Sequence, residues 1–175
     1  MAKTKGIIQV YTDGSYNQYK GVGGYGAVIF MNNRMKKFSS AVSYVDTSVH
    51  RMEVRAILAV LKRIKPGYSI DIYSDSEYCT EMIRKWHEDR FIHGKVNRVL
   101  WAELFKHMDR HISNGSNIKV SWIRGHAGNT FNEMADELAS IGASREKKVV
   151  CDAKEKPNVT RVQRTMDAIE QKKTT

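Results

Sequence analysis

The 175-residue chain has only two cysteines and no long apolar run, and each of these scarcities excludes a class of protein. Cys79 and Cys151 lie far apart and fit no metal-binding or redox spacing, so we expect two reduced thiols and no disulfide framework. No apolar stretch approaches the length of a transmembrane helix, and the opening MAKTKG lacks the hydrophobic segment of a signal peptide. The sequence therefore predicts a cytoplasmic protein without a membrane span.

Acidic residues are scarce relative to basic ones. The 19 Asp and Glu residues against 29 Lys and Arg residues give a formal net charge of +10 and a pI near 9.6. Such an excess attracts polyanions and raises the rate at which they meet the protein, but it carries no information on fold. Nucleic acid is the commonest partner of this kind, and an anionic membrane surface is the alternative. With 41% hydrophobic residues, the chain can form one globular domain with a sizeable core.

The first 42 residues predict three antiparallel strands. The segment IIQVYTDGSY, which begins at Ile7, is rich in strand formers but stops at Asp13, an acid at the tip of the predicted strand. A loop punctuated by glycines then precedes a second strand over 27–31. The pair Asn32-Asn33 predicts a tight turn into a third strand over 35–42. An antiparallel meander is therefore the expected start of the fold.

The chain from residue 47 to residue 144 predicts alternating helices and strands. Strands are expected at 70–74, immediately before Asp75, and at 118–123, because apolar residues alternate there. A helix followed by a returning strand indicates parallel strands joined by crossovers. Helical spacing predicts helices between Thr47 and Pro66 and over 76–86, 99–112 and 130–144, the last with Met134, Ala135, Leu138 and Ile141 facing inward.

Four carboxylates stand out by their positions. Asp13 and Asp75 follow predicted strands, whereas Glu53 and Asp136 lie in the first turns of predicted helices. Each position alone has an ordinary explanation, because acids near helix starts favour the macrodipole and acids after strands are common in turns. If the two strands are neighbours, the four acids would meet and repel one another unless a hard cation held them. The pattern therefore predicts a metal site.

Five segments carry a family resemblance: YTDGS, GGYGAVI, RMEVRAILAVL, YSDSEY and WIRGHAGNTFNEMADELA. In this order and spacing they resemble a type 1 ribonuclease H over residues 7–144. The resemblance implies an α/β, ribonuclease H-like fold: a five-stranded mixed sheet, three antiparallel strands then parallel strands, with helices on both faces. It also implies an endonuclease that hydrolyses the RNA strand of RNA/DNA hybrids and leaves 3′-hydroxyl and 5′-phosphate ends.

The same resemblance implies roles for the four acids and for one histidine. Asp13, Glu53, Asp75 and Asp136 would bind two Mg²⁺ ions, for which Mn²⁺ can substitute, in a two-metal-ion mechanism. Asp13 would bridge both ions, with Asp136 on the water-side ion and the other two acids on the second ion. His126, in the loop RGHAGN, would lie near the scissile phosphate and assist proton transfer or product release. The ordinary alternative for a lone histidine is a surface or structural residue.

The sequence departs from the family pattern at positions that would contact the hybrid. Val49 and His50 replace an Asn pair that many members have before the Arg-Met-Glu run, Tyr19 replaces an Asn of the first loop, and Glu77 replaces a Gln. The hydrogen bonds that those amides would make to 2′-hydroxyls or phosphates are therefore in question, whereas backbone contacts remain available. The candidate substrate-binding residues are Gly14, Ser15, His50, Glu77, Lys85, Arg90 and Lys95.

The segment from Trp86 to Trp101 looks like a shortened form of the basic protrusion of some bacterial members. A solvated charged loop is the alternative to phosphate binding there. Beyond residue 144 the apolar pattern thins, and residues 145–175 have nine Lys and Arg against five Asp and Glu. We expect a catalytic domain over 1–144 and a flexible basic tail over 145–175, with one short helix around 162–169.

Three other functions compete with this interpretation. A catalytically silent nucleic-acid-binding module is disfavoured because none of the four acids is lost, and an integrase or resolvase is disfavoured by the GHAG loop and the Arg-Met-Glu helix. A ribonuclease H domain of a reverse transcriptase is harder to dismiss, although Met1 and the basic tail favour a free-standing protein. We expect a monomer in the cytoplasm, or in a host cytoplasm if the source is viral. The sequence identifies no replication-protein partner.

Overall fold

The computed structural model describes residues 5–42, 47–88 and 97–145. Its strands form one five-stranded sheet in the order β3-β2-β1-β4-β5. The strands are β1 (Ile7–Asn17), β2 (Val22–Met31), β3 (Arg34–Val42), β4 (Ser69–Ser74) and β5 (Asn117–Trp122). The helices are α1 (Val49–Arg63), α2 (Glu77–His87), α3 (Arg98–Ser113) and α4 (Thr130–Ser144).

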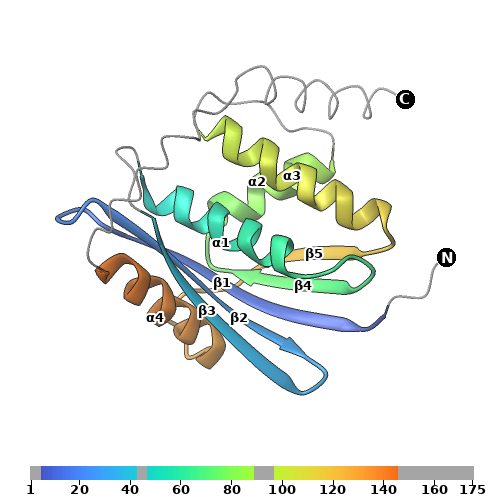
Figure 1. The fold of residues 1–175 in the computed structure, drawn as a ribbon, viewed down its shortest axis with the longest axis horizontal. Helices are drawn as coiled ribbons and strands as arrows, with labels where there is room; N and C mark the ends of the chain where they lie inside the picture. Colours follow the sequence, from blue (N-terminus) through green and yellow to red (C-terminus); the bar gives the residue numbers. More distant parts are fainter. Residues whose placement is uncertain (1–4, 43–46, 89–96, 146–175) are drawn as a thin grey trace.

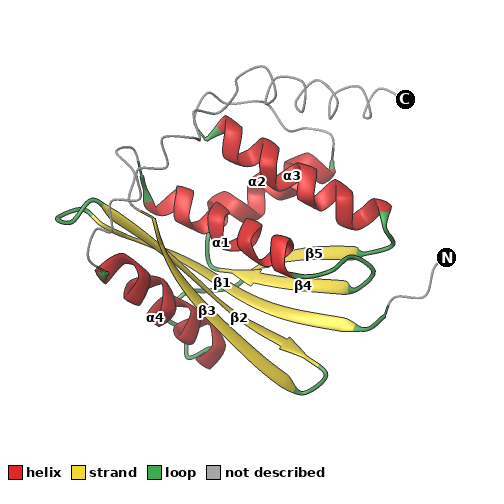
Figure 2. Cartoon of the chain, viewed as in Figure 1, coloured by secondary structure: helices red, strands yellow, loops and turns green. Residues whose placement is uncertain are grey.

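Helices cover both faces of the sheet. In Figure 1, α1, α2 and α3 lie over one face and α4 lies under the other, and Figure 2 shows the same layers by element type. The strands β1, β2 and β3 pair antiparallel, whereas β1, β4 and β5 pair parallel. The predicted fold class, including the meander and the parallel strands that follow it, is confirmed. In the described part of the chain, no helix combines the length and apolar character needed to span a bilayer.

Short polar side chains set where three of the helices begin. The Ser48 hydroxyl accepts a hydrogen bond from the Arg51 backbone N–H, so Ser48 caps α1. Ser76 caps α2 in the same way, and the Asn129 side chain caps α4. Such caps satisfy backbone donors that have no partner within the helix. The hairpin between β2 and β3 also follows the prediction, because Asn32 and Asn33 both adopt positive φ, at 49° and 60°.

Two features of the antiparallel strands differ from the prediction. β1 does not end at Asp13, and β2 includes Gly23, Gly24 and Gly26, which were expected to lie in a loop. A Cβ atom at Gly24 would overlap the Ala139 carbonyl oxygen, and one at Gly26 would lie 2.5 Å from the Leu138 Cβ. Gly24 and Gly26 therefore belong to a strand on which the α4 backbone packs too closely for a side chain at either position.

The same close packing changes the buried face of α4. Ile141 was expected to point inward but is 44% exposed, and Met134 and Leu138 are only partly buried. Larger side chains do not fit where the helix backbone touches the glycines of β2. The buried residues of α4 are Asn132, Ala135, Ala139, Gly142 and Ala143.

The main apolar core lies between the sheet and the other three helices. Residues of β1, β4, α1, α2 and α3 form one cluster there, in which Phe105 stacks against Trp86 and Trp101 at ring distances of 5.0 and 5.4 Å. Each such buried side chain stabilises the fold by about 1.5–3 kcal/mol. Cys79 is buried in this cluster as a free thiol, as expected, whereas Cys151 and the predicted helix at 162–169 lie outside the described residues.

Candidate active site

The parallel pairing of β1 with β4 brings two acids to one edge of the sheet. Its last pair is Thr12 with Ser74, so Asp13 and Asp75 are the next residues on their two strands. Beyond this point β1 pairs only with β2, and Asp13 lies opposite Gly26 in that pairing. The two acids are therefore neighbours, as predicted, but Asp13 marks the end of the pairing with β4 rather than the end of β1.

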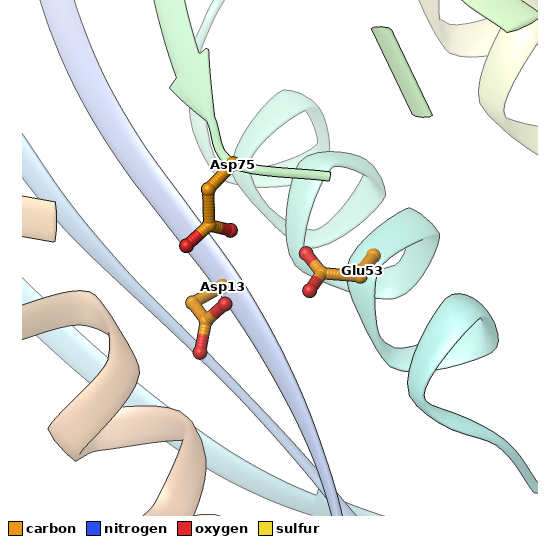
Figure 3. A group of neighbouring side chains, drawn as sticks. All are labelled: Asp13, Glu53 and Asp75. Atoms are coloured by element: carbon orange, nitrogen blue, oxygen red, sulfur yellow. The ribbon is translucent and has the colours of Figure 1, made fainter. Parts of the chain in front are cut away.

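Glu53 reaches the same edge from α1. A Cβ atom at Gly14 would overlap the Glu53 backbone nitrogen, so the glycine lets this turn of α1 approach β1. The carboxylates of Asp13, Glu53 and Asp75 each offer an oxygen, and these oxygens lie within 4.8 Å of one another. Figure 3 shows the three carboxylates turned toward a common space. We call these three residues the acid group.

Burial and nearby negative charge raise the pKa values of Asp13 and Glu53. Asp13 and Glu53 are each 6% exposed. Burial, followed by the nearby charges of Asp75 and Asp136, raises the pKa of Asp13 to about 8. Burial and the charges of Asp13 and Asp75 raise the pKa of Glu53 as well, and a hydrogen bond from the Gly14 backbone opposes both shifts. Full ionisation of the group therefore requires positive charge close by.

The acid group has the chemistry of a site for a hard divalent cation. Glu53 Oε2 is buried and accepts no hydrogen bond from the described residues. Buried carboxylate oxygens normally have a partner, and an unpaired oxygen beside two further carboxylates suits Mg²⁺, Mn²⁺ or Ca²⁺. The residues present therefore fit a metal ion, and Asp13, Glu53 and Asp75 could hold it.

Asp136 lies on α4, at the margin of the acid group. It is partly buried, and its charge contributes to the raised pKa of Asp13, so the two carboxylates lie within electrostatic reach. The structure thus brings three of the four predicted acids together and places the fourth beside them. The role of Asp136 as a ligand stays a prediction.

Comparisons with known proteins agree with this geometry. A model of the RNase H family matches residues 5–144. The chain belongs to the ribonuclease H family. It is 32% identical over 143 residues to ribonuclease H of Hahella chejuensis, an alignment that covers 77% of this chain and 92% of that protein. It is 37% identical over 144 residues to ribonuclease HI of Haemophilus influenzae, with coverage of 78% and 89%. For ribonuclease HI of Haemophilus ducreyi, identity is 35% over 145 residues, with coverage of 78% and 90%.

Asn132 is a site residue that the sequence reasoning missed. Its side chain is almost fully buried, and its Nδ2 donates a hydrogen bond to Asp75 Oδ2 at 3.1 Å. Asn132 precedes Asp136 by one helical turn, so both side chains lie on the same face of α4. Its Oδ1 is buried without a hydrogen-bond partner in the described residues. The spacing of one helical turn between Asn132 and Asp136 is visible in the sequence and could have revealed Asn132 as a site residue.

In this ribonuclease H family member, the His126 loop runs beside the acid group. His126 is exposed and has a φ of 50° in the loop between β5 and α4. Its neighbour Gly125 lies so close to Asp75 that a Cβ atom would be 2.7 Å from the Asp75 Oδ2. Glycine therefore lets the loop pass the acid group, and the role of His126 in proton transfer or product release stays a prediction.

Two of the predicted substrate-binding residues lie on β1 and two lie at helix starts near the acid group. Gly14 is buried under α1, and Ser15 follows it with partial exposure. His50 is exposed in the first turn of α1, with its ring 4.8 Å from that of Tyr78. Glu77 is the exposed first residue of α2, where a carboxylate favours the helix dipole. Their contacts with substrate stay predictions.

The basic candidates are less well placed by the structure. Lys85 forms an ion pair with Glu81 on α2, with Nζ and Oε1 3.4 Å apart and both side chains partly exposed. An exposed pair of this kind is weak enough to be exchanged for a phosphate contact. Arg90 and Lys95 lie outside the described residues.

The raised pKa of Asp13 predicts how stability depends on pH when metal is removed. In the unfolded chain Asp13 loses its proton from about pH 3.8 upward, whereas in the folded chain it keeps the proton to about pH 8. The folded state therefore binds more protons between these values, and its advantage is lost as pH rises through that window. We expect the free energy of unfolding of Asp13→Asn to exceed that of the natural chain by an amount that grows from pH 4 to pH 8. Urea unfolding in chelator at several pH values measures this difference; a constant difference contradicts it.

Proposed function

We propose that this chain is an endoribonuclease that hydrolyses the RNA strand of RNA/DNA hybrids and leaves 3′-hydroxyl and 5′-phosphate ends. The acid group, in a chain of the ribonuclease H family, carries this proposal. The relatives named above are ribonucleases H and HI, and the net charge of +10 favours a polyanionic substrate. A silent binding module would have no need of a buried, mutually repelling group of acids.

The proposed cofactor is a pair of Mg²⁺ ions held by Asp13, Glu53, Asp75 and Asp136, with Mn²⁺ able to substitute. When bound, such ions activate the attacking water and stabilise charge on the leaving oxygen. The chain's own residues prepare the site: Gly14 allows Glu53 to approach β1, and Asn132 fixes one oxygen of Asp75. These side chains are held on strands and helices of the core, so the ligand oxygens keep their places before substrate arrives.

The proposed substrate surface surrounds the acid group. His50 and Glu77 are exposed at the starts of α1 and α2, and Ser15 lies beyond Gly14 on β1. Contacts from these residues and from the backbone of 14–15 would reach the sugars of the hybrid, where the 2′-hydroxyl distinguishes RNA from DNA. His126 would move a proton at, or release, the cleaved phosphate.

The proposed division of the chain places the catalytic domain at 1–144 and a basic extension at 145–175. Two observations support it: α4 ends at Ser144, and the family match ends at residue 144. All four proposed metal ligands lie in the first part.

Replacing Asp13 tests the proposed chemistry. We expect Asp13→Asn to abolish cleavage of an RNA/DNA hybrid while the fold stays intact or becomes more stable, because one repelling charge is removed and a ligand is lost. The measurement is a gel with hybrid, duplex RNA and duplex DNA, each with and without Mg²⁺. Asp71→Asn, on β4 outside the acid group, is the matched control and should cleave normally. Cleavage by Asp13→Asn at a near-normal rate, or cleavage by the natural chain in chelator, would contradict the proposal.

The His126→Ala variant should be slower rather than inactive. A side chain that assists proton transfer contributes about 10²- to 10⁴-fold, which is less than the loss of a shared metal ligand. Single-turnover cleavage of saturating hybrid measures the rate. His87→Ala, at the end of α2 distant from Asp75, is the control and should keep the natural rate. A His126→Ala enzyme with full activity would return His126 to a surface role.

Removal of residues 145–175 should weaken substrate binding without affecting the fold. The tail has too few regularly spaced apolar residues to join the core, so the thermal midpoint should barely change. Each phosphate contact that a Lys or Arg makes releases counterions. A truncated chain that makes fewer such contacts should therefore bind hybrid more weakly at moderate salt and with a shallower salt dependence. Turnover at saturating hybrid should be unchanged. A full-length variant with the nine tail Lys and Arg residues changed to Gln separates charge from length; unfolding or loss of turnover on truncation would show that the boundary is misplaced.

A further inference from the structure

The backbone of Asp75 lies where two regular elements meet. The ladder between β4 and β5 ends with the pair Ser74 and Trp122, and the Ile123 N–H donates to the Ser74 carbonyl at 3.0 Å. Asp75 follows immediately, and Ser76 then caps α2. The Asp75 carbonyl is therefore the first one beyond the ladder, and no strand in the described part of the chain supplies a donor to it. A side chain or solvent can supply that donor instead.

The indole of Trp122 supplies that donor. Trp122 Nε1 donates a hydrogen bond to the Asp75 carbonyl oxygen at 3.1 Å. The Trp122 side chain is 48% exposed, whereas Trp86 and Trp101 are buried in the core. A large aromatic residue that remains half-exposed contributes less to the core than the two buried ones. Its indole N–H makes the hydrogen bond to Asp75.

This hydrogen bond acts on the proposed metal site through the peptide plane. The Asp75 carbonyl belongs to the peptide that links Asp75 to Ser76. A hydrogen bond to this carbonyl therefore restricts the ψ angle of Asp75 and fixes the backbone from which the Asp75 side chain extends. On the same residue, Asn132 Nδ2 holds the carboxylate oxygen Oδ2. The backbone is thus fixed from β5 and the carboxylate from α4. Hydrogen-bond partners of a metal ligand orient it, and their loss commonly lowers metal affinity.

We propose that Trp122 is a positioning residue for Asp75: its indole N–H holds the Asp75 peptide and thereby presents the carboxylate for metal binding. Trp122 itself touches neither metal nor reacting atoms. The proposal rests on the role of Asp75 as a metal ligand, which belongs to the proposed function. It goes beyond that function in naming a residue of β5, outside the four acids, on which the metal affinity depends.

The test is calorimetric titration of the full, metal-free chain with Mn²⁺, compared between the natural chain and Trp122→Phe. Phe keeps an aromatic ring but loses the N–H. Since one hydrogen bond of this kind changes an equilibrium by about two- to tenfold, we expect Trp122→Phe to weaken Mn²⁺ binding by that factor. Asn132→Ala, which frees the carboxylate itself, should weaken it by about 10- to 100-fold. Ile112→Ala, an exposed apolar position at the end of α3, is the control and should leave Mn²⁺ binding unchanged.

Steady-state cleavage then separates positioning from a structural or substrate-binding role. In Trp122→Phe, the Mn²⁺ concentration for half-maximal activity should rise by the same factor as the dissociation constant. At saturating Mn²⁺, kcat should return to within about twofold of the natural value, and KM for hybrid should be unchanged. Trp122→Tyr also lacks the indole N–H, so we expect the same changes as in Trp122→Phe. It replaces Trp122→Phe in these measurements if that variant folds poorly.

Distinct results overturn the inference and the function on which it rests. If folded Trp122→Phe or Trp122→Tyr binds Mn²⁺ as tightly as the natural chain does, the positioning role is overturned. If the natural chain also cleaves hybrid, the proposed function stays intact. A raised KM for hybrid with unchanged Mn²⁺ affinity would make Trp122 a substrate contact and would also overturn it. A natural chain that neither binds Mn²⁺ nor cleaves hybrid would overturn both.

Discussion

The parallel pairing of β1 with β4 is the constraint on which the rest of the site depends. Because that ladder stops at Thr12 and Ser74, the two acids that follow lie side by side at its end, and no loop is needed to bring them together. Everything else approaches this fixed pair: α1 from one face with Glu53, and α4 from the other face with Asn132 and Asp136. A site built on strand and helix backbones in this way is more precise than one carried by loops alone.

Close helix approach is what makes the arrangement possible, and it accounts for the glycines. Gly14 admits the backbone of α1, Gly24 and Gly26 admit that of α4, and Gly125 admits the loop that carries His126. A side chain at any of these positions would push an element that holds a site residue. Glycine inside a strand costs stability on its own account, through conformational entropy and lost packing. Here that cost is offset by tight packing of small α4 side chains on β2 and by the aromatic core on the other face.

Much of the fold and part of the site could be predicted from the sequence, because periodicity, caps and the five motifs are local signals. The antiparallel meander and the parallel strands followed from the local patterns, and the helices on both faces followed from the family resemblance that the motifs carry. The meeting of Asp13 with Asp75 was predicted on the condition that their strands are neighbours, which the pairing of β1 with β4 meets. Two of the errors share one cause. The glycines before residue 27 suggested a loop, and the spacing of Ile141 suggested a buried position, because local patterns carry no information on the tertiary proximity of α4 to β2. Asn132 and Trp122 were missed for a similar reason, since their partner Asp75 is 57 and 47 residues away in the chain.

The acid group also explains why its surroundings are so constrained. Three carboxylates within 4.8 Å of one another, with two of them buried, destabilise the folded state whenever they are ionised and no cation is near. Without a cation, Asp13 relieves part of this repulsion by keeping its proton to about pH 8. The fold nevertheless holds the carboxylates together: Asn132 donates to Asp75 Oδ2, the Trp122 indole donates to the Asp75 carbonyl, and the buried turn of α1 carries Glu53. The repulsion is thereby kept in the folded protein, where a divalent cation can relieve it, so part of the affinity for metal arises from strain that the fold maintains.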